Sequence, residues 1–180
     1  MAKRGRSKKL KIFSLPLKQG QMHLSFGMIF SIILIIAFVA FAFYAIMKII
    51  GLQKSVTVGQ FVKDLQEDVD KMWRGSEGSQ PVEYRLPSEI TYVCFVDYSI
   101  PKEGTWQDLY SPLRRSYTGN ENLFFYPSEA AGNLASTEIA HLDMNSIISI
   151  NNPFCIKNTK GKIKITLSKN YGEALVMLEE

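Results

Sequence analysis

The most prominent pattern in the chain is an apolar run from Phe26 to Met47, in which only three residues depart from a hydrocarbon surface. No charged side chain occurs between Lys18 and Lys48. As a helix these 22 residues span about 33 Å, which matches the ~30 Å hydrocarbon core of a bilayer. A buried helix of a soluble domain would show a polar face, and this run shows none. The pattern therefore predicts a transmembrane helix within residues 21–50.

The periodicity then changes to that of an amphipathic helix. Apolar residues recur at steps of one, three and four from Val58 to Trp73, and charged or amide side chains fill most of the remaining positions. Gly75 opens a Gly/Ser-rich stretch, so we expect it to stop the helix. Residues 51–75 are thus interpreted as an amphipathic stalk helix. Its apolar stripe is expected to pack on the chain's own head domain; packing against copies of itself or a partner is the alternative.

Residues 76–180 show the pattern of a β-rich domain, with short β-branched and aromatic runs bounded by turn residues. The clearest hairpin is expected between Phe154–Asn158 and Lys162–Ser168, because apolar and polar residues alternate strictly in the second run. The strands are expected at Val82–Leu86, Ile90–Tyr98, Leu123–Tyr126, Ile139–Asp143, Ser146–Ile150, Phe154–Asn158, Lys162–Ser168 and Ala174–Leu178. The fold class is α+β: a transmembrane helix, an amphipathic stalk helix and a small, mostly antiparallel head.

One long loop is expected within this head. The segment Ser99–Asn122 contains two prolines and two glycines and has no sustained periodicity. Its apolar side chains Trp106, Leu109 and Tyr110 are expected to pin it to the head as a satellite cluster.

Charge predicts the orientation of the membrane helix. Seven Lys and Arg residues precede the apolar run, and the first acidic residue of the chain is Asp64. Basic flanks stay on the cytoplasmic side, so we expect residues 1–20 to be a basic cytoplasmic tail or leader in a single-pass protein of the cell membrane. The C-terminal domain is then extracytoplasmic.

The same count removes nucleic acid as an expected partner. The net charge is +4 and the pI about 9.0, but from Ser55 onward the chain carries 12 basic and 17 acidic side chains. The basic excess belongs to the tail, which has the single aromatic residue Phe13. The lipid bilayer, with its anionic headgroups, is the expected partner of that tail.

Candidate chemistry in the head is limited to two cysteines. Cys94 and Cys155 both lie in the exported part and within expected strands, where an oxidising compartment favours a disulfide; two buried thiols are the alternative. His23 and His141 are too few and too far apart for a zinc site, and His141 is interpreted as an ordinary strand residue. The sequence contains no phosphate loop, nucleophile elbow, His-Glu-x-x-His or Cys-x-x-Cys motif. We therefore expect no catalytic site, metal or cofactor.

The order of these parts, with Gly20-Gln21 between the basic leader and the apolar helix, resembles archaeal type IV pilin-like proteins. In that family a membrane peptidase cuts after a small residue just before the apolar helix and frequently leaves glutamine as the new N-terminus. The resemblance implies a processing site at Gly20 and Gln21. The chain departs from the pattern at Ser25, where many pilins carry a glutamate, and at Gln19, where a second positive charge is usual. Stretches such as 152–157 are also similar in texture to single-pass membrane proteins of small archaeal genomes, which implies no activity.

Two functions from different classes are consistent with these observations. The leading hypothesis is a non-enzymatic, membrane-anchored surface protein whose head makes protein contacts, as a pilin-like subunit or part of an envelope complex. Its partners would be envelope proteins or copies of itself, and the small-xxx-small pair Gly27 and Ser31 would let a neighbouring helix approach closely. The alternative is a membrane-tethered enzyme or sensor that binds a small ligand with the aromatic region Trp106–Tyr126.

Overall fold

The computed structural model describes residues 26–180, apart from the side chain of Leu52. The basic tail and the candidate processing site at Gly20 and Gln21 lie outside the described residues. The fold is α+β: one long N-terminal helix is followed by two antiparallel sheets. This confirms the expected α+β class with helix before antiparallel sheets, although the two expected helices form one.

Helix α1 (Phe26–Arg74) contains both the apolar run and the amphipathic segment. It ends where the sequence predicts, because the backbone N–H of Gly75 donates to the carbonyl groups of Lys71 and Met72 at 3.2 and 3.1 Å. The chain divides into two compact units, Met1–Phe43 and Tyr44–Glu180. The second unit contains the later part of α1 and the whole head.

The head contains a three-stranded and a four-stranded sheet, with short helices in the connections. The three-stranded sheet has the order β1-β6-β7, formed by β1 (Gly78–Arg85), β6 (Lys162–Lys169) and β7 (Met177–Glu179). The four-stranded sheet has the order β4-β3-β2-β5, formed by β4 (Ser136–Thr137), β3 (Leu123–Tyr126), β2 (Tyr92–Phe95) and β5 (Phe154–Lys157). The connections contain α2 (Gln107–Leu113), η1 (Arg114–Ser116), η2 (Ser128–Ala131) and α3 (Met144–Ile147).

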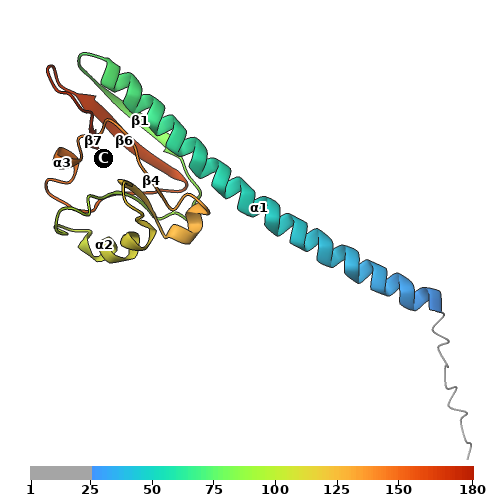
Figure 1. The fold of residues 1–180 in the computed structure, drawn as a ribbon. Coiled ribbons are helices and arrows are strands. Elements are labelled where there is room, and N and C mark those ends of the chain that lie inside the picture. Colours follow the sequence, from blue (N-terminus) through green and yellow to red (C-terminus); the bar gives the residue numbers. More distant parts are fainter. Residues whose placement is uncertain (1–25) are drawn as a thin grey trace, which may run out of the picture. The chain divides into compact units, whose positions relative to one another are not determined.

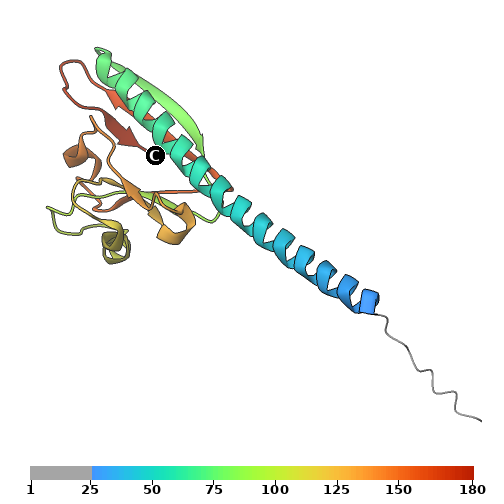
Figure 2. The same cartoon turned by 45° about the vertical axis from the view of Figure 1, so that its right-hand side comes forward.

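The apolar stripe of α1 is part of the main core. Val58, Phe61, Leu65 and Val69 are all buried there, which confirms that the stripe packs on the chain's own head. In Figures 1 and 2 this part of α1 runs alongside β1 and β6, and the segment that contains α2 lies on the far side of the head. The ring of Phe61 lies at the centre of this contact and meets one ring from each sheet edge-on: Tyr84 at 5.4 Å and Phe125 at 5.7 Å.

The four-stranded sheet is apolar on both faces. Alternate residues such as Val93, Phe125 and Ile156 face the main core, whereas Cys94 and Phe124 belong to a second cluster on the opposite face. The segment 98–117 packs on this second cluster. Both faces are therefore covered, which explains why strands β2 and β3 read as nearly continuous apolar runs.

The expected hairpin between Phe154–Asn158 and Lys162–Ser168 is wrong. A tight turn does join Thr159 to Lys162, but β5 pairs with β2 while β6 pairs with β1 and β7. Strict alternation along a strand identifies its buried face and does not identify its neighbour. The eight-residue strand β1 offers β6 a longer ladder than the four-residue β5 does, so β6 pairs with β1.

Two other expected strands are not strands. Residues 139–143 form an irregular segment with one isolated bridge, from Leu142 to Val176. Residues 146–150 were expected as a strand, but α3 covers Met144–Ile147, and Asp143 caps it by accepting a hydrogen bond from the Ser146 N–H at 3.2 Å. Asp143 is a residue type that favours the N-terminal cap of a helix, whereas the apolar residues after it, taken alone, resemble a strand.

The remaining expectations differ mainly in their boundaries. The segment 99–122 was expected as a loop throughout, but it contains α2 and η1. Strand β2 is shorter than the expected Ile90–Tyr98, β1 begins earlier than Val82, and β7 lies nearer the C-terminus than the expected Ala174–Leu178. These differences leave the class of fold unchanged.

Candidate functional site

A disulfide connects the two strands that bear the cysteines. Cys94 on β2 stands directly opposite Cys155 on β5, with their Cα atoms 4.0 Å apart, and their sulfurs are bonded. The bond links positions 61 residues apart in the sequence. The predicted pairing is therefore confirmed.

Aromatic side chains cover this disulfide. Trp106, Leu109 and Tyr110 pack against the cluster that contains both cysteines, which confirms the expected satellite cluster. The Tyr98 ring lies 4.8 Å from the Tyr110 ring and meets the ring of Phe124 edge-on at 5.5 Å. The Tyr98 hydroxyl donates to the carbonyl oxygen of Tyr110 at 3.2 Å, and burial raises the pKa of Tyr98 above its usual value of 10.0.

These contacts account for the aromatic content of the region 106–126. Its rings pack on one another, on the sheet and on the disulfide, so their role in the described structure is to form a second core. This packing explains why the region Trp106–Tyr126, from which a ligand site was hypothesised, is rich in aromatic residues.

A different polar and aromatic cluster ties the last turns of α1 to an irregular segment of the head. The rings of Trp73 and His141 are stacked, with centroids 3.8 Å apart and planes within 6°. His141 Nδ1 lies 3.1 Å from Asp70 Oδ1, and the Gln66 side-chain oxygen accepts from the backbone N–H of Ala140 at 2.9 Å. The hydrogen bond from His141 is the largest cause of the lowered pKa of Asp70, and a second bond from Gln66 adds to it.

His141 thus differs from its expected role as an ordinary strand residue. Its backbone has φ of 66°, a left-handed conformation that no strand contains, and its ring contacts α1. The sequence held one signal for this contact: Gln66, Asp70 and Trp73 share one face of the helix at steps of four and three. Nothing in the sequence identified their partner across 71 residues.

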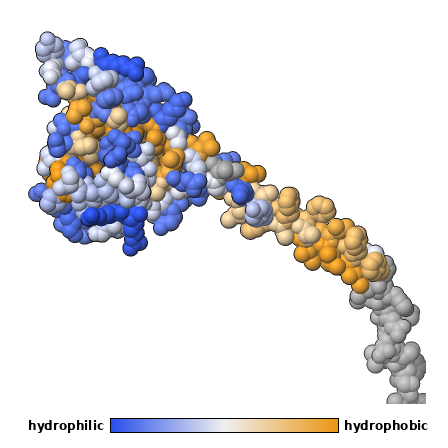
Figure 3. Space-filling view, viewed as in Figure 1, coloured by the Kyte–Doolittle hydropathy of each residue, from blue (hydrophilic) through white to orange (hydrophobic). Residues whose placement is uncertain are grey.

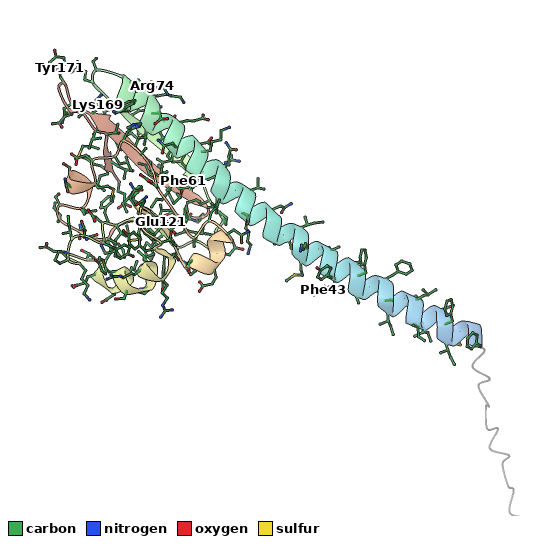
Figure 4. The ribbon with its side chains drawn as sticks, in the orientation of Figure 1. Phe43, Phe61, Arg74, Glu121, Lys169 and Tyr171 are labelled. Atoms are coloured by element: carbon green, nitrogen blue, oxygen red, sulfur yellow. A yellow bond between two sulfur atoms is a disulfide. The ribbon has the colours of Figure 1, made fainter. Side chains whose placement is uncertain are left out.

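Exposed aromatic and basic side chains gather at the same end of the head, which we call the tip and define by Trp73, Arg74 and Tyr171. Tyr171 follows β6 and is 83% exposed, and Trp73 is 38% exposed. Lys169, at the end of β6, joins the two chain segments because its Nζ donates to the carbonyl oxygens of Trp73 and Gly75. Figure 4 shows Arg74, Lys169 and Tyr171 at this end.

The first part of α1 is exposed and mainly apolar. Every residue from 26 to 43 is exposed, and Figure 3 shows this part as a mainly hydrophobic surface. Its length and composition suffice to cross a membrane. Gly27 and Ser31 lie one turn apart, and the Ser31 hydroxyl donates to the Gly27 carbonyl at 2.8 Å, which satisfies the polar group within the helix.

Within residues 26–180, no group of three or more His, Cys, Asp or Glu side chains has an arrangement that would hold a metal ion. Comparisons with protein-family models, with curated proteins and with solved structures find no match to this chain.

Proposed function

We propose that this chain is a single-pass, membrane-anchored surface protein whose extracytoplasmic head makes protein contacts and has no enzymatic role. The observation that carries the proposal is the change of surroundings along α1. Its first part exposes apolar side chains all round, and its later part buries one apolar stripe in a disulfide-bonded head. A bilayer would cover the first surface.

The tip is the part of the head best suited to contact another protein. Trp, Tyr and Arg are the residues most enriched among those that dominate binding energy at protein interfaces. Trp73 lies 23 residues beyond Ile50 in α1, or about 35 Å along the helix axis. Its position would keep the tip clear of the lipid headgroups and accessible to a partner.

A photoreactive amino acid at Tyr171 tests this contact in intact cells. We expect a specific adduct at Tyr171, loss of that adduct in Trp73→Ala, and none when the probe replaces the exposed Ser111 on α2. Equal adducts at the two positions, or an adduct indifferent to Trp73, would show that the tip is not the contact surface.

A pilin-like subunit is the more specific form of the proposal. Copies would then pack through their apolar helices, with Gly27 and Ser31 as the point of closest approach. The only two cysteines of the chain form the disulfide, so an introduced cysteine is the single free thiol. Oxidation should cross-link Ser31→Cys between copies and leave Ile29→Cys, on the opposite face of the helix, as a monomer. Failure of both variants to cross-link would leave only an anchored protein without helix-mediated assembly.

Processing between Gly20 and Gln21 would also distinguish a pilin-like subunit from a plain anchored protein. Removal of the basic leader would release charges that hold the helix at the cytoplasmic leaflet, each worth about 1 kcal/mol near anionic lipid. Mass spectrometry of the protein extracted from its native membrane should then give Gln21 as the first residue. An N-terminus at Met1 or Ala2, unchanged when Gly20 is replaced by a bulky residue, would exclude processing.

A further inference from the structure

Two neighbouring cavities share a lining residue, and the smaller one adjoins α1 where the helix enters the head. One, of about 510 Å³, is lined by Ile50 and Lys54 of α1, by Arg85 and by Lys160, with other residues of the same segments. The other, of about 630 Å³, is lined by residues of β1, β5 and β6 and also by Lys160. Lys160 therefore stands between the two cavities, on the turn that follows β5.

The surface around these cavities carries an excess of positive charge. Lys54 pairs with Glu89 at 2.8 Å, and Lys162 pairs with Glu83 at 2.6 Å. Four further cations line the cavities, are exposed and have no ion pair with any residue from 26 to 180. We call these four the basic flank: Arg85, Lys157, Lys160 and Lys164. Three acidic side chains, Glu83, Glu89 and Glu180, also line the two cavities, against six basic ones, so the lining keeps a net positive charge.

The turn at Lys160 adds a second, independent observation. Thr159 and Lys162 are joined by two backbone hydrogen bonds, of 2.8 and 3.2 Å, around a two-residue turn. Both central residues have positive φ, 54° for Lys160 and 80° for Gly161. Asn or Asp is the usual residue at the first of these positions, because a left-handed backbone disfavours longer side chains. A lysine here is conformationally unfavourable, and backbone strain of this kind clusters at functional sites.

The position of the basic flank along α1 indicates its partner. The expected transmembrane segment extends to Ile50, and the headgroup layer of a bilayer is about 5–7 Å deep on each side, or roughly four helical residues. Gln53 and Lys54 would therefore lie among the headgroups. Arg85 and Lys160 line the same cavity as Ile50 and Lys54, so they would lie at the same level.

We propose that the basic flank is a docking surface for anionic phospholipid headgroups of the leaflet from which α1 emerges, and that this contact holds the head against the membrane. The inference rests on the membrane anchorage proposed above. Positive charge on this side does not conflict with the orientation, because a domain translocated as a whole crosses largely regardless of its charge. Anionic lipid and an acidic protein would both complement this charge. Lipid is favoured because its headgroups would already lie at the level of Arg85 and Lys160.

Full-length protein in vesicles tests the contact. A dye on Ser88→Cys, beside the basic flank, should be quenched by nitroxide-labelled headgroups more strongly when phosphatidylglycerol is mixed into phosphatidylcholine than in phosphatidylcholine alone. This excess quenching, the difference between the two lipid mixtures, should fall as salt shortens the Debye length from ~10 Å at 0.1 M to ~3 Å at 1 M. A dye on Tyr171→Cys, at the tip, should show no excess. Cationic lipid should reverse the effect at Ser88, which checks the sign without altering the protein.

A triple variant and a matched control test the residues. Each basic residue near an anionic surface contributes about fivefold to the ratio of docked to undocked heads. Arg85→Gln/Lys157→Gln/Lys160→Asn should therefore lower that ratio by roughly 100-fold; Asn at position 160 suits the left-handed backbone. The control Lys63→Gln/Lys71→Gln/Arg74→Gln removes the same charge further along α1 and should leave the excess unchanged.

Flotation of the protein with the vesicles distinguishes failure of the proposed membrane anchorage from failure of the proposed lipid docking. If the protein does not float with the vesicles, the membrane anchorage itself is wrong. If it floats but quenching is independent of lipid charge, or if the two triple variants behave alike, anchorage stands and the lipid-docking surface is wrong.

Discussion

Two buried asparagines organise the irregular parts of the head. The Asn152 amide donates to the carbonyl oxygens of Asp97, Ile100 and Pro101 at 2.8, 3.1 and 3.3 Å. Asn158 donates in the same way to the loop before β2, at 2.9 and 2.7 Å. Each side-chain amide donates to loop carbonyl groups in place of the backbone N–H groups that would do so in a helix or a sheet.

We predict that Asn152→Ala destabilises the head. Asn152 is 1% exposed, and its truncation removes its three hydrogen bonds to the loop carbonyl groups, at a cost of about 1–3 kcal/mol. Chemical denaturation should show this loss, whereas the same substitution at the exposed Asn145 should change stability by less than about 0.5 kcal/mol. Equal effects at the two positions would contradict the role assigned to the amide.

The contact between Asp70 and His141 should make stability depend on acid. The pKa of Asp70 is lower in the folded chain than its ordinary value of 3.8, so the unfolded chain binds the proton first. The contribution of this contact to the free energy of unfolding is complete above pH 3.8 and is lost as the pH falls through the lower pKa of Asp70 in the folded chain. Asp70→Asn should therefore flatten the loss of stability below pH 3.8, and Asp108→Asn, an exposed control, should not. A parallel acid profile for wild type and Asp70→Asn would refute this.

At the scale of single residues, the sequence predicted the contact that depends only on which residue types are present and where they lie in the chain. Cys94 and Cys155 could be paired because they are the only cysteines of the chain and both lie in expected strands of the head. The stack of His141 on Trp73 could not be predicted, because it depends on a left-handed turn set by the surrounding packing.

At the scale of elements, α1 is stabilised by its buried stripe. Leu65 is fully buried and Val56, on the same helix, is 70% exposed. We predict that Leu65→Ala costs about 2–5 kcal/mol through lost burial and the cavity left behind. Val56→Ala should change stability by about 0.5 kcal/mol or less. Similar losses for both, measured by denaturant unfolding of the full chain in detergent, would show that the stripe does not pack as described.

The disulfide should be the largest single stabilising link between elements. Closing a loop of 61 residues is worth about 4 kcal/mol on the chain-entropy model. Replacing both Cys94 and Cys155 by Ala should lower the free energy of unfolding by about that amount. Reductant should destabilise the wild type and have no effect on the double variant. A wild type insensitive to reductant would contradict the link.

Period and composition predicted the existence of elements better than their pairing. The three-to-four-residue period of α1 and the strict alternation in β6 each report a buried face, which local sequence encodes. Pairing depends on competition between distant segments, and β1 displaced β5 as the neighbour of β6 because it matches eight residues instead of four.

At the scale of the whole molecule, one helix joins two chemical environments. The apolar run predicted a transmembrane helix, and the amphipathic stripe predicted a stalk helix that packs on the head; in the structure the two segments form the single helix α1. The tip and the basic flank were not predicted, because both bring together segments that are distant in the sequence. The tip joins the end of α1 to the segment after β6, and the basic flank joins β1, β5 and β6 with the turn at Lys160.

Labelling of single cysteines in sealed cells tests the central claim, that the helix crosses the membrane with the head outside. Ser79→Cys, exposed in β1, should react with a membrane-impermeant maleimide in intact cells. Ser7→Cys, in the basic segment, should react only after the cells are lysed. Reaction of Ser7→Cys in intact cells, with Ser79→Cys protected until lysis, would contradict the account.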